Sequence, residues 1–153
     1  MKQLKEIPFY YYMLLLSTTA IAFGVEWDIS WHSSVGRDKL LSPPHVVVYL
    51  GGVLCGLICT YIVFQQTFFI KNSKGVKFWG FKAPLACWIC IWGMIAMLTS
   101  APFDDWWHNA YGLDVQIVSP PHMVLAIGIF SVILGTCLLI LAQKNNIPES
   151  IIM

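Results

Sequence analysis

Four long apolar stretches alternate with short polar ones along the chain. Residues 8–25, 45–70, 83–101 and 123–143 contain no Asp, Glu, Lys or Arg. A helix that crosses a bilayer needs about 20 predominantly apolar residues. The pattern therefore predicts an all-α integral membrane protein with four transmembrane helices, in a single membrane domain over residues 1–153. The first stretch continues directly into polar sequence without a small-residue cleavage site, so we expect a retained helix rather than a signal peptide.

Composition supports lipid as the main surrounding of the chain. Hydrophobic residues make up 58% of it and charged residues only 11%, whereas soluble domains carry about 25% charged residues. The net charge of +1 gives no basis for binding nucleic acid. The expected partners are the lipid bilayer and either other membrane subunits or further copies of this chain.

The charged residues are distributed unequally between the two sides of the predicted membrane. Most lysines lie near the N-terminus, in residues 71–82, or in the C-terminal tail, and four spans place these three regions together. The positive-inside rule makes that side cytoplasmic. We therefore expect a multi-pass protein of the cell inner (cytoplasmic) membrane with both termini cytoplasmic. The acidic loops between spans then face the periplasm or exterior.

The two exterior loops share one motif. Residues 28–45 read DISWHSSVGRDKLLSPPH and residues 104–122 read DDWWHNAYGLDVQIVSPPH. Each contains an Asp, a Trp-His pair, a Gly, a second Asp and a Ser-Pro-Pro-His, and together they hold all four histidines of the chain. The chain thus divides into two helix-motif-helix repeats, residues 7–70 and 78–143. Parallel repeats of this kind are related by a twofold axis along the membrane normal.

Each motif has the residues of a metal site with open coordination positions. An Asp and a His four residues apart share one face of a helix, here a short helix where the chain leaves the membrane. Ser-Pro-Pro is typical of a helix start, which places the second His in the first turn of the next span. Two imidazoles and one carboxylate bind zinc, copper or iron. The predicted ligands are Asp28, His32, His45, Asp104, His108 and His122.

Three further charged residues are expected around these ligands. Asp38 and Asp114 are placed to hold a histidine ring by its other nitrogen, and Arg37 lies beside Asp38. The motifs also allow a structural interpretation, in which Asp and His simply pair and Ser-Pro-Pro only begins a helix. Repetition of the whole pattern favours metal binding over this structural interpretation. The spacing leaves open whether the ligands form two mononuclear sites or one dinuclear site.

The five cysteines all lie in apolar runs, where a thiol is usually a small packing residue. Cys87 and Cys90 form a C-x-x-C, but within a predicted span that has no His or charge nearby. We therefore expect the cysteines to pack helices together rather than to bind a metal or exchange disulfides.

The first motif resembles a known metal-binding segment. Over residues 26–49 it is similar to the C subunit of copper membrane monooxygenases, the particulate methane and ammonia monooxygenases. The resemblance implies copper bound by Asp28, His32 and His45, with Arg37 and Asp38 in the place of that family's Arg-Asp. The second motif resembles uncharacterised bacterial multi-pass membrane proteins, and it has Leu113 where the first has arginine.

Copper is the expected ion, with zinc as the alternative that the same ligands suit. Three classes of function fit the sequence. The chain could be an oxygen-activating, monooxygenase-like copper subunit of a larger complex. It could instead handle copper or zinc without catalysis, for delivery or assembly. Thirdly, it could be a structural subunit whose motifs tie helix ends together. The sequence does not decide whether the protein is an enzyme.

Overall fold

The protein is an all-α membrane protein with four helices long and apolar enough to cross a bilayer. The structure, a computed structural model, describes residues 7–35, 41–70, 75–112 and 119–145. The helices in this part of the chain are α1 (Phe9–Ser34), α2 (Pro43–Phe68), α3 (Leu85–Tyr111) and α4 (Pro120–Asn145). Their outer faces carry many exposed large apolar side chains, including Phe23, Leu50, Leu57, Ile127 and Phe130. Such faces suit a lipid surrounding.

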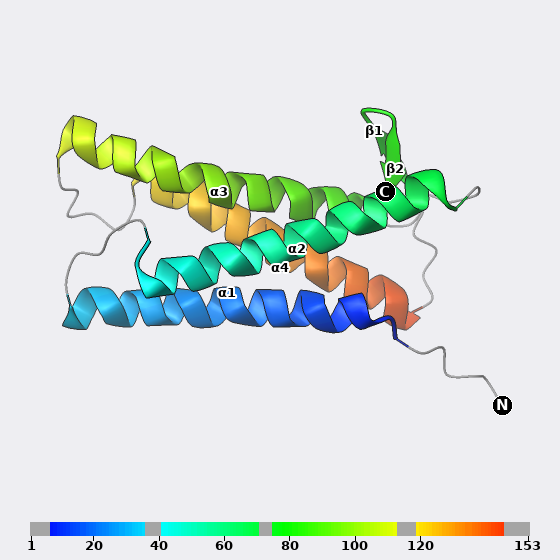
Figure 1. Cartoon of the computed structure of the whole chain (residues 1–153), viewed down its shortest axis with the longest axis horizontal. Helices are drawn as coiled ribbons and strands as arrows, with labels where there is room; N and C mark the ends of the chain where they lie inside the picture. The colour runs from blue at the N-terminus through cyan, green and yellow to red at the C-terminus, as the bar shows by residue number, and fades with distance from the viewer. Residues whose placement is uncertain (1–6, 36–40, 71–74, 113–118, 146–153) are drawn as a thin grey trace.

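The helices pack as two antiparallel pairs (Figure 1). α1 packs chiefly on α2, and α3 chiefly on α4, while α2 and α3 join the two pairs. The end of α1, the start of α2, the end of α3 and the start of α4 all lie at one end of the bundle, on the left in Figure 1. Both motifs are therefore at the same end, which we call the motif end.

The first and third helices are longer than the sequence pattern predicts. α1 continues beyond residue 25 to Ser34, and α3 continues beyond residue 101 to Tyr111. The separate short helices expected in the motifs are thus extensions of the membrane helices. Pro102 removes one backbone N–H from α3 without ending it. Gly112, with a φ of 86°, ends α3 in a conformation that glycine adopts without strain.

Matching positions of the two halves make matching close contacts. Gly51 of α2 approaches α1, because a Cβ there would lie 2.9 Å from the carbonyl oxygen of Ser17 and against Ile21. Gly128 of α4 approaches α3, because a Cβ there would lie 2.8 Å from the carbonyl oxygen of Gly93 and 2.9 Å from the nitrogen of Met97. Ser17 and Gly93, like Ile21 and Met97, are 76 positions apart, and Asp28 and Asp104 have the same offset.

A β-hairpin lies at the end opposite the motifs, where the sequence analysis expected only a loop. β1 (Val76–Phe78) and β2 (Phe81–Ala83) pair antiparallel with Phe78 opposite Phe81. The two turn residues, Trp79 and Gly80, both have positive φ, as tight hairpins require. The alternating sequence Val-Lys-Phe and Phe-Lys-Ala is the signal that could have predicted it.

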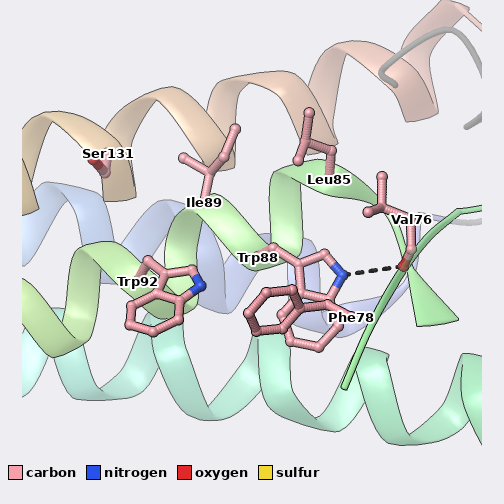
Figure 2. A pocket seen from close by; sticks show the side chains of 7 residues that line it. All are labelled: Val76, Phe78, Leu85, Trp88, Ile89, Trp92 and Ser131. Carbon is pink, nitrogen blue, oxygen red and sulfur yellow. Dashed lines mark hydrogen bonds between the residues drawn. The ribbon is translucent and has the colours of Figure 1, made fainter. Parts of the chain in front are cut away.

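The hairpin closes one side of an apolar pocket of about 360 Å³ against α3 and α4 (Figure 2). The Nε1 of Trp88 donates a hydrogen bond of 3.4 Å to the carbonyl oxygen of Val76, which holds the hairpin on α3. Ser131 is the polar residue of the lining, and its hydroxyl already bonds the Ile127 carbonyl of its own helix at 2.8 Å. The pocket provides packing and no metal ligands.

Candidate metal-binding sites

The first motif places one carboxylate between two histidines from different helices. Asp28 Oδ1 lies 3.3 Å from the Nε2 of His45, and Asp28 Oδ2 lies 3.8 Å from the Nδ1 of His32. Asp28 and His32 are on α1, whereas His45 is in the first turn of α2. The side chains of Asp28 and His45 are about three-quarters buried, and that of His32 is half exposed. The predicted residues thus meet at the motif end.

The second motif repeats the carboxylate–imidazole contact within one helix. Asp104 Oδ1 lies 3.4 Å from the Nε2 of His108, both on α3. The other ring nitrogen of His108 lies 3.3 Å from the carbonyl oxygen of Gly112. A carbonyl oxygen only accepts hydrogen bonds, so this nitrogen carries a proton. The Nε2 of this ring faces the carboxylate of Asp104.

The carboxylate oxygen of Asp104 is the other atom of this contact. Oδ1 is buried and accepts no hydrogen bond from the residues that the structure describes. A buried anionic oxygen without a donor is costly unless a cation lies beside it. Its 3.4 Å separation from Nε2, like the 3.3 Å separation in the first motif, suits a bound ion. Two ligands bound to one tetrahedral ion at about 2.0–2.1 Å lie about 3.3–3.4 Å apart.

The second histidine of each motif is located as the sequence predicts. α2 begins after Ser42 and α4 begins after Ser119, so each histidine is the third residue of its helix. Ser42 is the N-cap residue, although its side chain makes no capping hydrogen bond. The hydroxyl of Ser119 lies 2.6 Å from the Nδ1 of His122. This contact orients the His122 ring through its Nδ1.

The structure assembles these ligands only in part. We compared the distances between possible ligand atoms of His, Cys, Asp and Glu among the described residues. One group of three has its ligand atoms all within 4.8 Å of one another, and its members are cysteines. Asp28 contacts both of its histidines, but the three do not meet that criterion, and neither does the second motif. Arg37, Asp38 and Asp114, predicted around the ligands, lie outside the described residues.

The cysteine set is the feature that sequence reasoning did not predict. The sulfurs of Cys55 and Cys59, on α2, and of Cys90, on α3, converge in the core of the bundle, where all three side chains are fully buried. Cys87 lies next to Cys59. The i, i+4 spacing in α2 and the C-x-x-C in α3 were visible in the sequence. Their convergence depends on how α2 and α3 pack, which no local pattern encodes.

Aromatic side chains surround the motif end. Trp27 and Trp31 contact each other on α1, and Trp107 contacts Tyr111 on α3 with ring centroids 4.5 Å apart. Trp106 and Tyr111 are more than half exposed. Amphipathic rings at this level are typical of the membrane–water interface. The motif residues therefore belong at the depth where lipid headgroups meet water.

Comparisons of the chain with protein-family models, with curated proteins and with solved structures find no match.

Proposed function

We propose that this membrane protein binds copper at the motif end, with Asp28, His32 and His45 as one ligand set and Asp104, His108 and His122 as the other. The observation that carries the proposal is the contact between the Asp28 carboxylate on α1 and the Nε2 of His45 on α2. A carboxylate offsets the charge of an ion that two imidazoles bind, and a position remains open for water or substrate.

Hydrogen bonds to the histidine rings support metal binding over simple pairing. The Nδ1 of His32 lies 2.9 Å from the carbonyl oxygen of Asp28, so Nδ1 carries a proton and the neutral ring has its lone pair on Nε2. The Nδ1 of His108 likewise donates a hydrogen bond of 3.3 Å to the carbonyl oxygen of Gly112. Metal-binding histidines commonly donate their second nitrogen in this way. Both rings are therefore oriented with Nε2 as the nitrogen left to bind an ion.

Copper is proposed over zinc for two reasons. The first motif resembles the copper-binding segment of the membrane monooxygenases, and imidazole-rich sites bind Cu²⁺ most strongly among divalent first-row ions. Two uses of the copper follow from different observations. The resemblance favours oxygen activation within a larger membrane complex. The half-exposed ring of His32 favours exchange of the ion with a partner, as in copper delivery.

A structural role is the competing proposal. Asp28 on α1 contacts His45 on α2, and this contact alone could tie the two helix ends together. In that case the aspartate and histidines stabilise the bundle and no ion is required. We further propose that the motif end faces the exterior of the inner membrane, because the lysines gather at the opposite side.

Metal analysis of the purified full chain tests the proposal. Wild type is loaded with Cu²⁺, passed through a desalting column, and compared with the His45→Ala/His122→Ala double variant. Retained Cu²⁺, measured by electron paramagnetic resonance so that Cu(I) is not counted, should fall by about tenfold or more in the double variant. Asn109→Ala, an exposed change next to His108, is the control and should retain the wild-type amount. Equal copper in all three proteins contradicts the proposal.

A further inference from the structure

We propose that the buried cysteines form a second metal site, distinct from the motifs, that binds Cu(I) through Cys55, Cys59 and Cys90. Their three sulfurs lie within 4.8 Å of one another and come from two helices. Three sulfurs bound to one ion at about 2.3 Å in a trigonal plane lie about 4 Å apart. An ion therefore fits with only small side-chain adjustments. This inference does not depend on copper binding at the motifs.

The cysteine site lies in the membrane interior, well away from the motif end. Cys55 is ten residues after His45 on α2, which corresponds to about 15 Å along the helix axis. No ligand set can therefore be shared between the two places. The sulfurs are fully buried, and burial suits an ion that is held rather than exchanged quickly with water.

One hydroxyl group and one glycine make the surroundings of the sulfurs more specific than ordinary packing. The hydroxyl of Thr136, on α4, lies 3.7 Å from the sulfur of Cys55. Its hydrogen can donate to a sulfur that becomes negatively charged on binding an ion. A Cβ at Gly135 would overlap the sulfur of Cys90, so glycine leaves the space that this sulfur occupies.

The ligand type and the low-polarity location favour Cu(I). Thiolates are soft ligands that select Cu(I), zinc or iron–sulfur clusters. Zinc sites of the closed, structural kind almost always have four ligands. Here three sulfurs all lie within 4.8 Å of one another, and Cys87, although next to Cys59, is outside that set. A monovalent ion also needs only one thiolate for neutrality, and uncompensated charge is costly inside a membrane. Each thiol that binds as a thiolate releases one proton to solvent when the ion enters.

The test uses full-length protein that lacks one histidine of each motif, so that the two proposals fail independently. The His45→Ala/His122→Ala variant is reduced, loaded anaerobically with substoichiometric Cu(I), and its copper coordination is measured by X-ray absorption. The expected result is a copper ion surrounded by sulfur. Coordination by nitrogen or oxygen alone overturns the proposal, as does a cluster that keeps bound zinc and excludes Cu(I). This arm requires no change to the cysteines.

Cysteine variants provide the second arm of the test. In the same His45→Ala/His122→Ala background, Cys59→Ser is compared with Cys137→Ser, which changes the exposed cysteine outside the cluster. Competition with a Cu(I) chelator should show about tenfold or greater loss of affinity in Cys59→Ser. Cys137→Ser should match its parent. Equal affinities in the two variants overturn the assignment of the site to these sulfurs.

Discussion

Asp104 is the residue whose environment most clearly distinguishes a metal ligand from a surface charge. Its Oδ1 is buried 3.4 Å from His108, and the structure describes no hydrogen-bond donor to it. The next residue, Asp105, is also acidic, but its carboxylate accepts a hydrogen bond of 3.3 Å from the Nδ2 of Asn109. Two adjacent carboxylates with different partners provide a matched pair of variants.

We predict that Asp104→Asn lowers copper affinity by about tenfold or more, because an amide cannot offset the charge of the ion. Asp105→Asn removes the same formal charge one residue away and should change affinity by much less. Competition with a Cu²⁺ chelator measures both. Similar losses in the two variants would mean that the net acidity of the surface attracts copper, without Asp104 as a ligand.

Each helix pair of the bundle has one close backbone contact at a glycine, which we call a glycine crossing. Gly128 allows α4 to approach the backbone of α3 at Gly93, and Gly51 does the same between α2 and α1. These crossings set the spacing of each helix pair. The Gly51 crossing therefore also affects the distance between Asp28 on α1 and His45 on α2 at the motif end.

Gly128→Ala should reduce the free energy of unfolding by about 1–3 kcal/mol, because the added methyl meets backbone atoms that cannot move aside. Unfolding of the detergent-solubilised protein by a denaturing detergent measures the change. Ile127→Ala, at a neighbouring side chain that is 60% exposed, should change stability by about 0.5 kcal/mol or less. If Gly128→Ala is as stable as wild type, the helices do not cross as closely as described.

The sequence predicts the helices well and their ends poorly. Uninterrupted apolar runs identify all four spans, and Ser-Pro-Pro correctly places the starts of α2 and α4. The polar residues after Val25 and Pro102 suggested that α1 and α3 end early, but backbone hydrogen bonding continues through both motifs. The hairpin was missed because each of its strands has only three residues.

The candidate sites also include a part that the sequence predicts and a part that it does not. Asp28 and His45 could be predicted as neighbours because a repeated motif and a helix start constrain them, and their contact agrees with that expectation. The metal ligation itself stays a prediction. The cysteine cluster could not be predicted, since it requires the lateral packing of α2 on α3. The spacing of residues in the sequence shows which side chains share a face of one helix, but not which faces of two helices pack together.

For the whole molecule, the two ends of the bundle differ in chemistry. The motif end carries aspartates, histidines and tryptophans, whereas the opposite end carries the hairpin with Lys77 and Lys82. The positive-inside rule orients such a protein with the hairpin in the cytoplasm. In that orientation the proposed copper sites are predicted to face the periplasm or exterior.

A cysteine introduced at Leu41, which is 79% exposed near the motif end, should react with a membrane-impermeant thiol reagent added to intact cells. One introduced at Lys77, an exposed position in β1, should react only after the membrane is permeabilised. Cys137→Ser in both variants removes the exposed native thiol. Labelling at 77 without labelling at 41 in intact cells would show the inverted orientation.

The proposed function requires, before anything else, that the histidines of the motifs bind copper. Electron paramagnetic resonance of the Cu²⁺-loaded full chain measures this directly, because imidazole nitrogens bound to copper give a resolvable hyperfine coupling. We expect this coupling in wild type and in Asn109→Ala. It should be lost in the His45→Ala/His122→Ala variant. A wild-type spectrum without nitrogen coupling, or one that the double variant reproduces, would contradict the account.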